Sequence, residues 1–201
     1  MSHRASAIPS NRLEAFSDAI FAIIITIMVF GIHPPTGHKF ADLTQLRPVF
    51  LSYLLSFIYL IIYWNNHHYL LRTVEHLNGW TMWANSNLLL WLSLIPISTT
   101  WLGTSGGAKA PAALYGFSLL MPAISYTLLQ ISIISTHGDD SSLKKALGND
   151  VKGKLSIVFY VIGIILSFFV PLISYILYIA VALMWIVPDR RIASELNADH
   201  E

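Results

Sequence analysis

The sequence contains no cysteine and very little charge, and both absences restrict what the chain can be. Without cysteine there is no disulfide, no thiolate metal site and no cysteine nucleophile. Charged residues make up 11% of the 201 residues, whereas soluble domains carry about 25%. The formal net charge is only +1, and nucleic-acid binding needs clustered basic residues. With 55% hydrophobic residues, the composition therefore predicts an integral membrane protein with no nucleic-acid partner and almost no extramembrane domain.

Six apolar segments of the sequence predict membrane-spanning helices, because about 20 apolar residues cross the hydrocarbon core of a bilayer. The last two share one run, residues 155–187, which is too long for one span and contains Pro171 in its middle. We therefore expect a helical hairpin with its turn near residues 168–174. The prediction is an all-α, polytopic membrane protein in which residues 1–201 form one six-helix transmembrane domain, with helices at approximately 13–32, 48–71, 80–102, 111–135, 155–170 and 172–187.

The basic residues predict the orientation of these helices, since cytoplasmic loops are enriched in lysine and arginine. A signal peptide is the competing interpretation of the first segment, but Asp18 interrupts its apolar stretch and no small-residue cleavage site follows Phe30. With the N-terminus and the C-terminus both cytoplasmic, nine basic residues lie inside and three outside. The inside residues are Arg4, Arg12, Arg72, Lys144, Lys145, Lys152, Lys154, Arg190 and Arg191, and the outside residues are Lys39, Arg47 and Lys109.

Polar side chains of the first three segments fall at one depth near the cytoplasmic face. Counting about 1.5 Å per helical residue places together Ser17, Asp18, Asn65, Asn66, His67, His68, Asn85 and Asn87. Arg12 and Asp18 are separated by about 240° around a helix, so each is expected to pair across helices or subunits. Polar groups in a membrane bundle serve as interhelical hydrogen bonds, and they also serve proton sensing or ion coordination. The sequence leaves these three roles open, with His67 and His68 as the candidate proton sensors.

Histidine is the remaining candidate for metal binding, and His67, His68 and His76 lie near Glu75. No HExxH or comparable ligand spacing joins them. No GxSxG nucleophile motif occurs either. We therefore expect no metal site, no cofactor and no enzymatic activity.

The first segment contains a stripe of large apolar residues at helical spacing. The stripe follows the pattern i, i+4, i+7, i+11 and i+14 and consists of Phe16, Ile20, Ile23, Ile27 and Phe30, with Thr26 beside it. Such a stripe faces lipid or a neighbouring helix, or it lines a conduit formed by symmetry-related copies. In the second case, isoleucine rings gate the conduit by dewetting. The periodicity alone favours neither arrangement.

The string RLEAFSDAIFAIIITIMVF, which begins at Arg12, resembles the RxxxFSD signature that opens the first helix of the transmembrane protein 175 family. Two further stretches resemble the family in register. They are the Trp-Asn-Asn-His-His sequence that begins at Trp64, and the Asn-Leu-Leu-Leu run that begins at Asn87 and leads to Pro96. Members of this family are potassium-permeable channels of lysosomes and prokaryotes.

The resemblance implies a homotetramer around a central pore lined by the first helix. Its main constriction falls on Ile23, and further pore-facing positions fall on Thr26 or Ile27 and on Phe30. The signature residues Arg12, Phe16, Ser17 and Asp18 have the role of packing and hydrogen bonding, and His67 or His68 joins their network, as does Asn87. The expected partners are copies of the chain, the lipid bilayer, and permeant potassium with other monovalent cations. The expected location is the inner or plasma membrane of a prokaryote.

Two functional hypotheses follow. The first is passive conduction of potassium through a pore with an isoleucine constriction. No TVGYG-like filter occurs, so we expect modest selectivity from the pore diameter and the Thr26 hydroxyls. The alternative is a proton-coupled secondary transporter that uses Asp18 with His67 or His68 as a relay.

Overall fold

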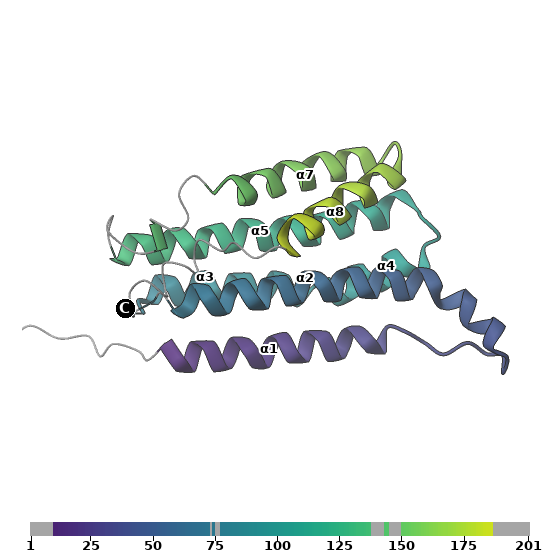
Figure 1. Cartoon of the computed structure of the whole chain (residues 1–201), viewed down its shortest axis with the longest axis horizontal. Coiled ribbons are helices and arrows are strands. Elements are labelled where there is room, and N and C mark those ends of the chain that lie inside the picture. The colour runs from purple at the N-terminus through teal and green to yellow at the C-terminus, as the bar shows by residue number, and fades with distance from the viewer. Residues whose placement is uncertain (1–9, 73, 75–76, 138–142, 145–149, 187–201) are drawn as a thin grey trace, which may run out of the picture.

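The computed structural model describes residues 10–72, 74, 77–137, 143–144 and 150–186. In these ranges, all elements of regular secondary structure are helical (Figure 1). Arg4, Glu75, His76, Lys145, Arg190 and Arg191 lie outside the described residues. The helices are α1 (Ser10–Phe30), the 3-10 helix η1 (Phe40–Leu46), α2 (Arg47–Arg72), α3 (Gly79–Leu92), α4 (Ile95–Thr104), α5 (Lys109–His137), α7 (Val151–Ser167) and α8 (Pro171–Ile186).

The long helices form an elongated bundle in which successive spans run in opposite directions (Figure 1). Helix α1 lies along one edge, α7 and α8 lie on the far side, and α2 and α5 lie between them. Helix α1 packs against α2, α3 and α4, whereas α5 packs against α3, α4, α7 and α8. The edge position of α1 leaves much of its surface without a partner in the protomer.

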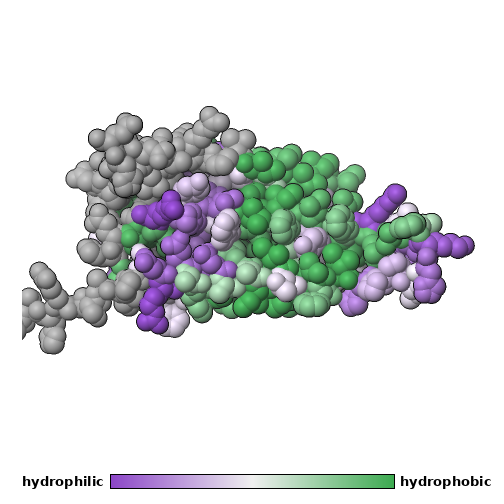
Figure 2. Space-filling model, turned by 60° about the horizontal axis from the view of Figure 1, so that its bottom comes forward, coloured by the Kyte–Doolittle hydropathy of each residue, from purple (hydrophilic) through white to green (hydrophobic). Residues whose placement is uncertain are grey.

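The surface carries a hydrophobic belt between two more polar ends (Figure 2). Three helical stretches are long and apolar enough to span a membrane, namely Ser10–Phe30, Phe40–Arg72 and Lys109–Thr136. Helix α8 is shorter and also apolar. We call the end at which α1, α3 and α7 begin the basic end, because it holds Arg12, Arg72, Lys152 and Lys154.

The third predicted helix is not continuous, which corrects the expected span at 80–102. Helix α3 ends at Leu92, Ser93 and Leu94 form a turn, and α4 begins at Ile95. The physical reason is Pro96, which has no amide hydrogen and whose ring collides with the carbonyl four residues earlier.

The other helices start or end a few residues from the predicted positions. Helix α7 begins at Val151 rather than at residue 155, because the Asp150 side chain caps it by accepting a hydrogen bond from the Gly153 amide at 3.1 Å. Hydropathy does not detect this polar first turn, whose stability comes from the cap. Helix α7 ends at Ser167 and α8 begins at Pro171, so the chain reverses direction over three residues.

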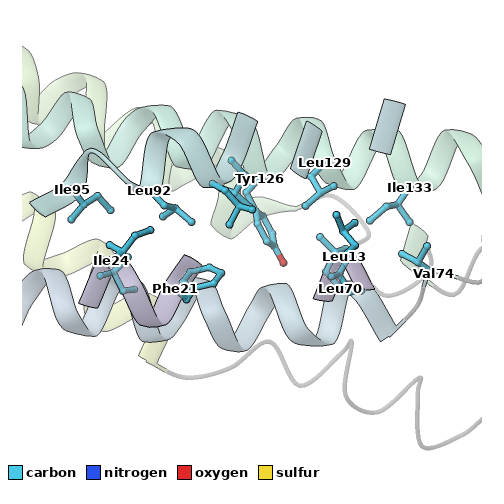
Figure 3. Packing of buried hydrophobic residues seen from close by; sticks show 14 of the residues in the cluster. Leu13, Phe21, Ile24, Leu70, Val74, Leu92, Ile95, Tyr126, Leu129 and Ile133 are labelled. Carbon is cyan, nitrogen blue, oxygen red and sulfur yellow. The ribbon is translucent and has the colours of Figure 1, made fainter. Parts of the chain in front are cut away.

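Two clusters of buried apolar residues hold the bundle together. The first joins α1, α2, α3 and α5 through side chains such as Phe21, Leu70, Leu92 and Leu129 (Figure 3). The second joins α2, α5, α7 and α8 and is rich in tyrosine, with Tyr59, Tyr115, Tyr160 and Tyr178 at its centre. The first cluster fixes α1 against the bundle and so positions the candidate site.

Candidate pore helix and its polar anchor

Helix α1 has one covered face and one open face. The covered residues follow helical spacing and are Leu13, Ser17, Phe21, Ile24 and Met28. On the opposite side, Ile23, Ile27 and Phe30 are 55%, 53% and 73% exposed. Phe16 is 56% exposed and belongs to the same stripe. The residues expected to line a pore therefore share the face of α1 that no other helix of the protomer covers.

Thr26 lies beside this stripe and is also exposed. Its hydroxyl donates a hydrogen bond to the Ala22 carbonyl at 2.8 Å. This bond uses the hydroxyl hydrogen and leaves oxygen lone pairs to accept from water or to contact a cation. Thr26 thus places a hydroxyl oxygen beside the apolar stripe of α1.

A buried chain of hydrogen bonds fixes α1 to α3 and α2. The Ser17 hydroxyl donates to the Leu13 carbonyl at 2.8 Å and accepts from the Asn85 amide nitrogen at 3.0 Å. The Asn85 amide oxygen then lies 2.7 Å from His67 Nε2. Because this oxygen only accepts, His67 carries its proton on Nε2. All three side chains are fully buried, so the chain fixes the rotation of α1 about its axis.

His67 is therefore the histidine that joins this network. Its ring packs against Phe21 with the centroids 5.8 Å apart. Its Nδ1 atom is buried and has no hydrogen-bond partner in the part of the chain that the structure describes. A proton at Nδ1 would lack an acceptor there, so the geometry is that of a neutral histidine.

The neighbouring His68 makes a different contact. Its Nδ1 lies 2.7 Å from a carboxylate oxygen of Glu14, and both side chains are about one-third exposed (32% and 29%). One turn earlier on α2 and one turn later on α1, the Trp64 indole donates to Asp18 at 2.9 Å. Sequence reasoning missed Glu14 and Trp64. Their signal was the i, i+4 spacing of Glu14 with Asp18 and of Trp64 with His68, which places each pair on one helix face.

The signature residues separate into two groups. Ser17 and Asp18 contact the neighbouring helices, whereas Phe16 and Arg12 are exposed on the open face. Within the described ranges, Arg12 forms no hydrogen bond or ion pair. Among the described residues of the protomer, Arg12 therefore does not pair with the polar layer. Its position on α1 points in the same direction as Ile23 and Phe30, away from that layer.

Asn87 forms an interhelical hydrogen bond to α5 and, within the described residues, does not bond the chain Ser17–Asn85–His67. Its amide donates to the Ser125 hydroxyl of α5 at 2.7 Å. Asn85 and Asn87 are two positions apart, about 200° around the helix, so they face different neighbours. Among the described residues, no group of three or more histidine, aspartate or glutamate side chains is placed to hold a metal ion.

Comparison with known proteins finds related sequences over most of the chain. The model of the family described as endosomal/lysosomal potassium channel TMEM175 matches residues 12–96. A potassium channel of Chryseobacterium sp. (strain P1-3) is 52% identical over 93% of this chain and 97% of its own length. A potassium channel of Chamaesiphon minutus is 32% identical over 60% of this chain and 64% of its own length.

A solved structure is also similar. The crystal structure of a lysosomal potassium-selective channel TMEM175 homolog from Chamaesiphon minutus superposes with a TM-score of 0.74 at 26% identity, covering 90% of this chain and 97% of that chain. The fold and the relatives thus define a helical membrane protein of the ion-channel class. The chain belongs to the TMEM175 family of potassium channels, which is a family of ion-transport proteins and not an enzyme class.

Proposed function

We propose that this protein is a homotetrameric, potassium-permeable cation channel whose pore is lined by α1. One observation carries the proposal. Helix α1 lies at the edge of the bundle and leaves Ile23, Ile27 and Phe30 more than half exposed. Four such faces brought together around an axis enclose a conduit of the kind that bundles of symmetry-related helices form. The potassium-channel relatives support ion conduction as the function of such a conduit.

Ile23 is the narrowest point in this proposal, and a ring of isoleucine side chains acts as the gate. A hydrophobic constriction excludes water when it is narrow and conducts when it widens. Phe30 extends the apolar stripe to the far end of α1. Thr26 supplies the polar oxygens next to the constriction, which gives modest rather than strict selectivity for potassium.

The hydrogen-bonded chain Ser17–Asn85–His67 has a positioning role in the gate. Rotation of α1 by one residue, about 100°, moves Ile23 off the axis and brings another side chain onto it. The buried contacts of Ser17 and Asn85 oppose such a rotation. In this proposal α1 needs a fixed rotation about its axis, because the gate depends on the Ile23 side chain alone.

The proposed location is the inner or plasma membrane of a prokaryote, with both termini cytoplasmic. The basic end supports this orientation, because lysine and arginine concentrate on the cytoplasmic side. The permeant ion is potassium, with passage of other monovalent cations, and no cofactor takes part.

The test is ion flux in liposomes containing the purified full-length protein, with potassium and sodium compared. Replacing the gate residue by a polar one, Ile23→Asn, hydrates the constriction and raises potassium flux. Val29→Asn is the matched control, because Val29 is also exposed on α1 but lies about 120° away from Ile23. Equal flux from Ile23→Asn and wild type, in samples of tetrameric mass, contradicts the proposal.

The transporter hypothesis requires Asp18, His67 and His68 to pass a proton among themselves. Their contacts are instead separate, with Trp64, Asn85 and Glu14 respectively. In the described part of the chain, no hydrogen bond joins one of the three to another. Saturable uptake driven by a pH gradient is the measurement that favours the transporter over a channel.

A further inference from the structure

A cavity lies away from α1, between α2, α5, α7 and α8 near the basic end. Its volume is about 500 Å³, including the part that opens to the outside. The lining includes Asp150 and Trp185 toward the ends of their helices, and Tyr63, Tyr126 and Tyr160 further along. The lining therefore combines one carboxylate with several aromatic side chains.

Two of the aromatic side chains use their polar atoms within the protein and present ring surface to the cavity. The Tyr126 hydroxyl donates to the Asn66 carbonyl at 3.0 Å. The Trp185 indole donates to the Ser156 hydroxyl at 2.9 Å. The Lys152 ammonium lies 5.7 Å from the Trp185 ring centroid, so this ring takes part in a cation–π contact.

Two polar groups of the cavity have unused hydrogen-bonding capacity. Gln130 is 4% exposed, lines the cavity, and forms no side-chain hydrogen bond within the described ranges. One oxygen of Asp150 accepts from the Gly153 amide, and the other has no hydrogen-bond partner among the described residues. The Gln130 amide is accessible from the cavity rather than sealed. It can therefore hydrogen-bond an occupant, and the second oxygen of Asp150 can accept a hydrogen bond from the same occupant.

We propose that this cavity binds a small amphipathic amine. The ammonium group lies at the Asp150 carboxylate, Gln130 accepts or donates a hydrogen bond below it, and the apolar body lies among the tyrosine rings. Aromatic faces and one carboxylate are the groups that recognise an organic cation. The amine is either a free molecule or the headgroup of an ethanolamine lipid, since both offer the same ammonium chemistry.

The test compares two probes that differ only in the polar group, 2-phenylethylamine and 2-phenylethanol. Their dissociation constants are measured by calorimetry on the full-length protein in detergent, against protein-free micelles. The amine is expected to bind at least about tenfold more tightly, as one charge-assisted hydrogen bond provides.

Asp150→Asn removes the charge and keeps a side chain that caps α7. We expect this variant to lose the preference for the amine. Asp42→Asn is the matched control, because Asp42 also accepts a backbone hydrogen bond, from Lys39 at 2.9 Å, at the opposite end of the molecule. Gln130→Met keeps the side-chain length, removes the amide and is expected to weaken binding of the amine severalfold. Equal binding of the two probes to wild type, or unchanged amine affinity in both Asp150→Asn and Gln130→Met, overturns the proposal.

Nanodiscs of phosphatidylethanolamine and of phosphatidylcholine then distinguish the two sources. Weaker binding of the probe amine in phosphatidylethanolamine, seen in wild type and absent in Asp150→Asn, assigns the site to the lipid headgroup. Equal binding in both lipids assigns it to a free amine. Binding is measured without ion flux, so its failure leaves the proposal for the pore unaffected.

Discussion

Helices α1 and α5 are both long and apolar, yet they occupy opposite situations in the bundle. In the most apolar stretch of each, 28% of the residues of α1 and 50% of those of α5 are buried. Helix α5 contacts helices on several sides, whereas α1 lies at the edge. Hydropathy alone therefore does not distinguish a helix at the centre of the bundle from a helix at its edge. Both are apolar because the lipid around an edge helix is as apolar as the protein around a central one.

Packing density separates the two helices further. On α5, Gly116 lies directly against Tyr178, whose hydroxyl donates to the Ala112 carbonyl at 3.2 Å. Small residues allow such close approach between membrane helices. On α1, the open face carries isoleucine and phenylalanine, which reach outward. The comparison predicts that changes on α5 alter folding, and that changes on the open face of α1 alter conduction.

The largest expected effect is that of Gly116→Leu. A side chain at this position collides with the Tyr178 hydroxyl and approaches Ile164 within 2.8 Å. We expect a loss of about 3 kcal/mol or more in the free energy of unfolding, measured by thermal unfolding of the purified protein. Ala110→Leu adds the same side chain at an exposed position of α5 and is expected to change little. Equal stability of the two variants would mean that α5 is not tightly packed.

The next effect is that of Asn85→Leu, which breaks the anchor of α1. The substitution leaves the buried Nε2–H of His67 without an acceptor and removes the donor to the Ser17 oxygen, whose hydroxyl keeps its bond to the Leu13 carbonyl, at a cost of about 1–2 kcal/mol. The double variant Asn85→Leu/His67→Phe removes both polar partners and is expected to recover part of the stability. The measurement is a double-mutant cycle by thermal unfolding, and strictly additive losses would show that the two residues do not interact.

Ile27→Ala tests the open face of α1 directly. Because Ile27 is 53% exposed in the protomer, the free energy of unfolding is expected to change by less than about 0.5 kcal/mol. Potassium flux is expected to rise, since the conduit widens next to Ile23. Ile24→Ala, on the covered face, is the contrasting variant, with a loss of about 2 kcal/mol or more. A large loss of stability in Ile27→Ala would place this residue in a packed contact within the protomer.

The smallest effect is expected for Asp18→Asn. The Trp64 indole donates to a carboxylate oxygen of Asp18, and an asparagine oxygen accepts the same bond. The free energy of unfolding is therefore expected to change by less than about 0.5 kcal/mol. Asp18→Leu, which removes the acceptor, is the comparison. If Asp18→Asn is as destabilising as Asp18→Leu, the charge of Asp18 has a role beyond this contact.

Much of the fold could be predicted because membrane spans depend on local composition. The ranges of α2 and α5 lie within two residues of the predicted segments 48–71 and 111–135. The break between α3 and α4 was not predicted, although Pro96 and its effect on the preceding turn were visible in the sequence. The first turn of α7 was missed because it depends on a cap rather than on hydropathy.

Some features of the candidate site could be predicted from the sequence, and others could not. Helical spacing identified the stripe of Ile23, Ile27 and Phe30 and the depth of the polar layer. It did not decide which histidine meets Asn85, because adjacent residues of a helix point about 100° apart and their partners depend on how the helices pack. The contacts of Glu14 and Trp64 needed the relative rotation of α1 and α2.

The sequence by itself determined that the chain is an apolar, helical membrane protein, and it predicted the apolar segments and where the basic residues concentrate. These properties follow from the transfer of single residues between water and lipid, so no neighbour has to be known. Only the tertiary structure decided that α1 lies at an edge with Ile23 and Ile27 uncovered, that His67 rather than His68 bonds Asn85, and that a cavity forms between α2, α5, α7 and α8. These features depend on the rotation and contacts of helices distant in sequence, which hydropathy does not encode.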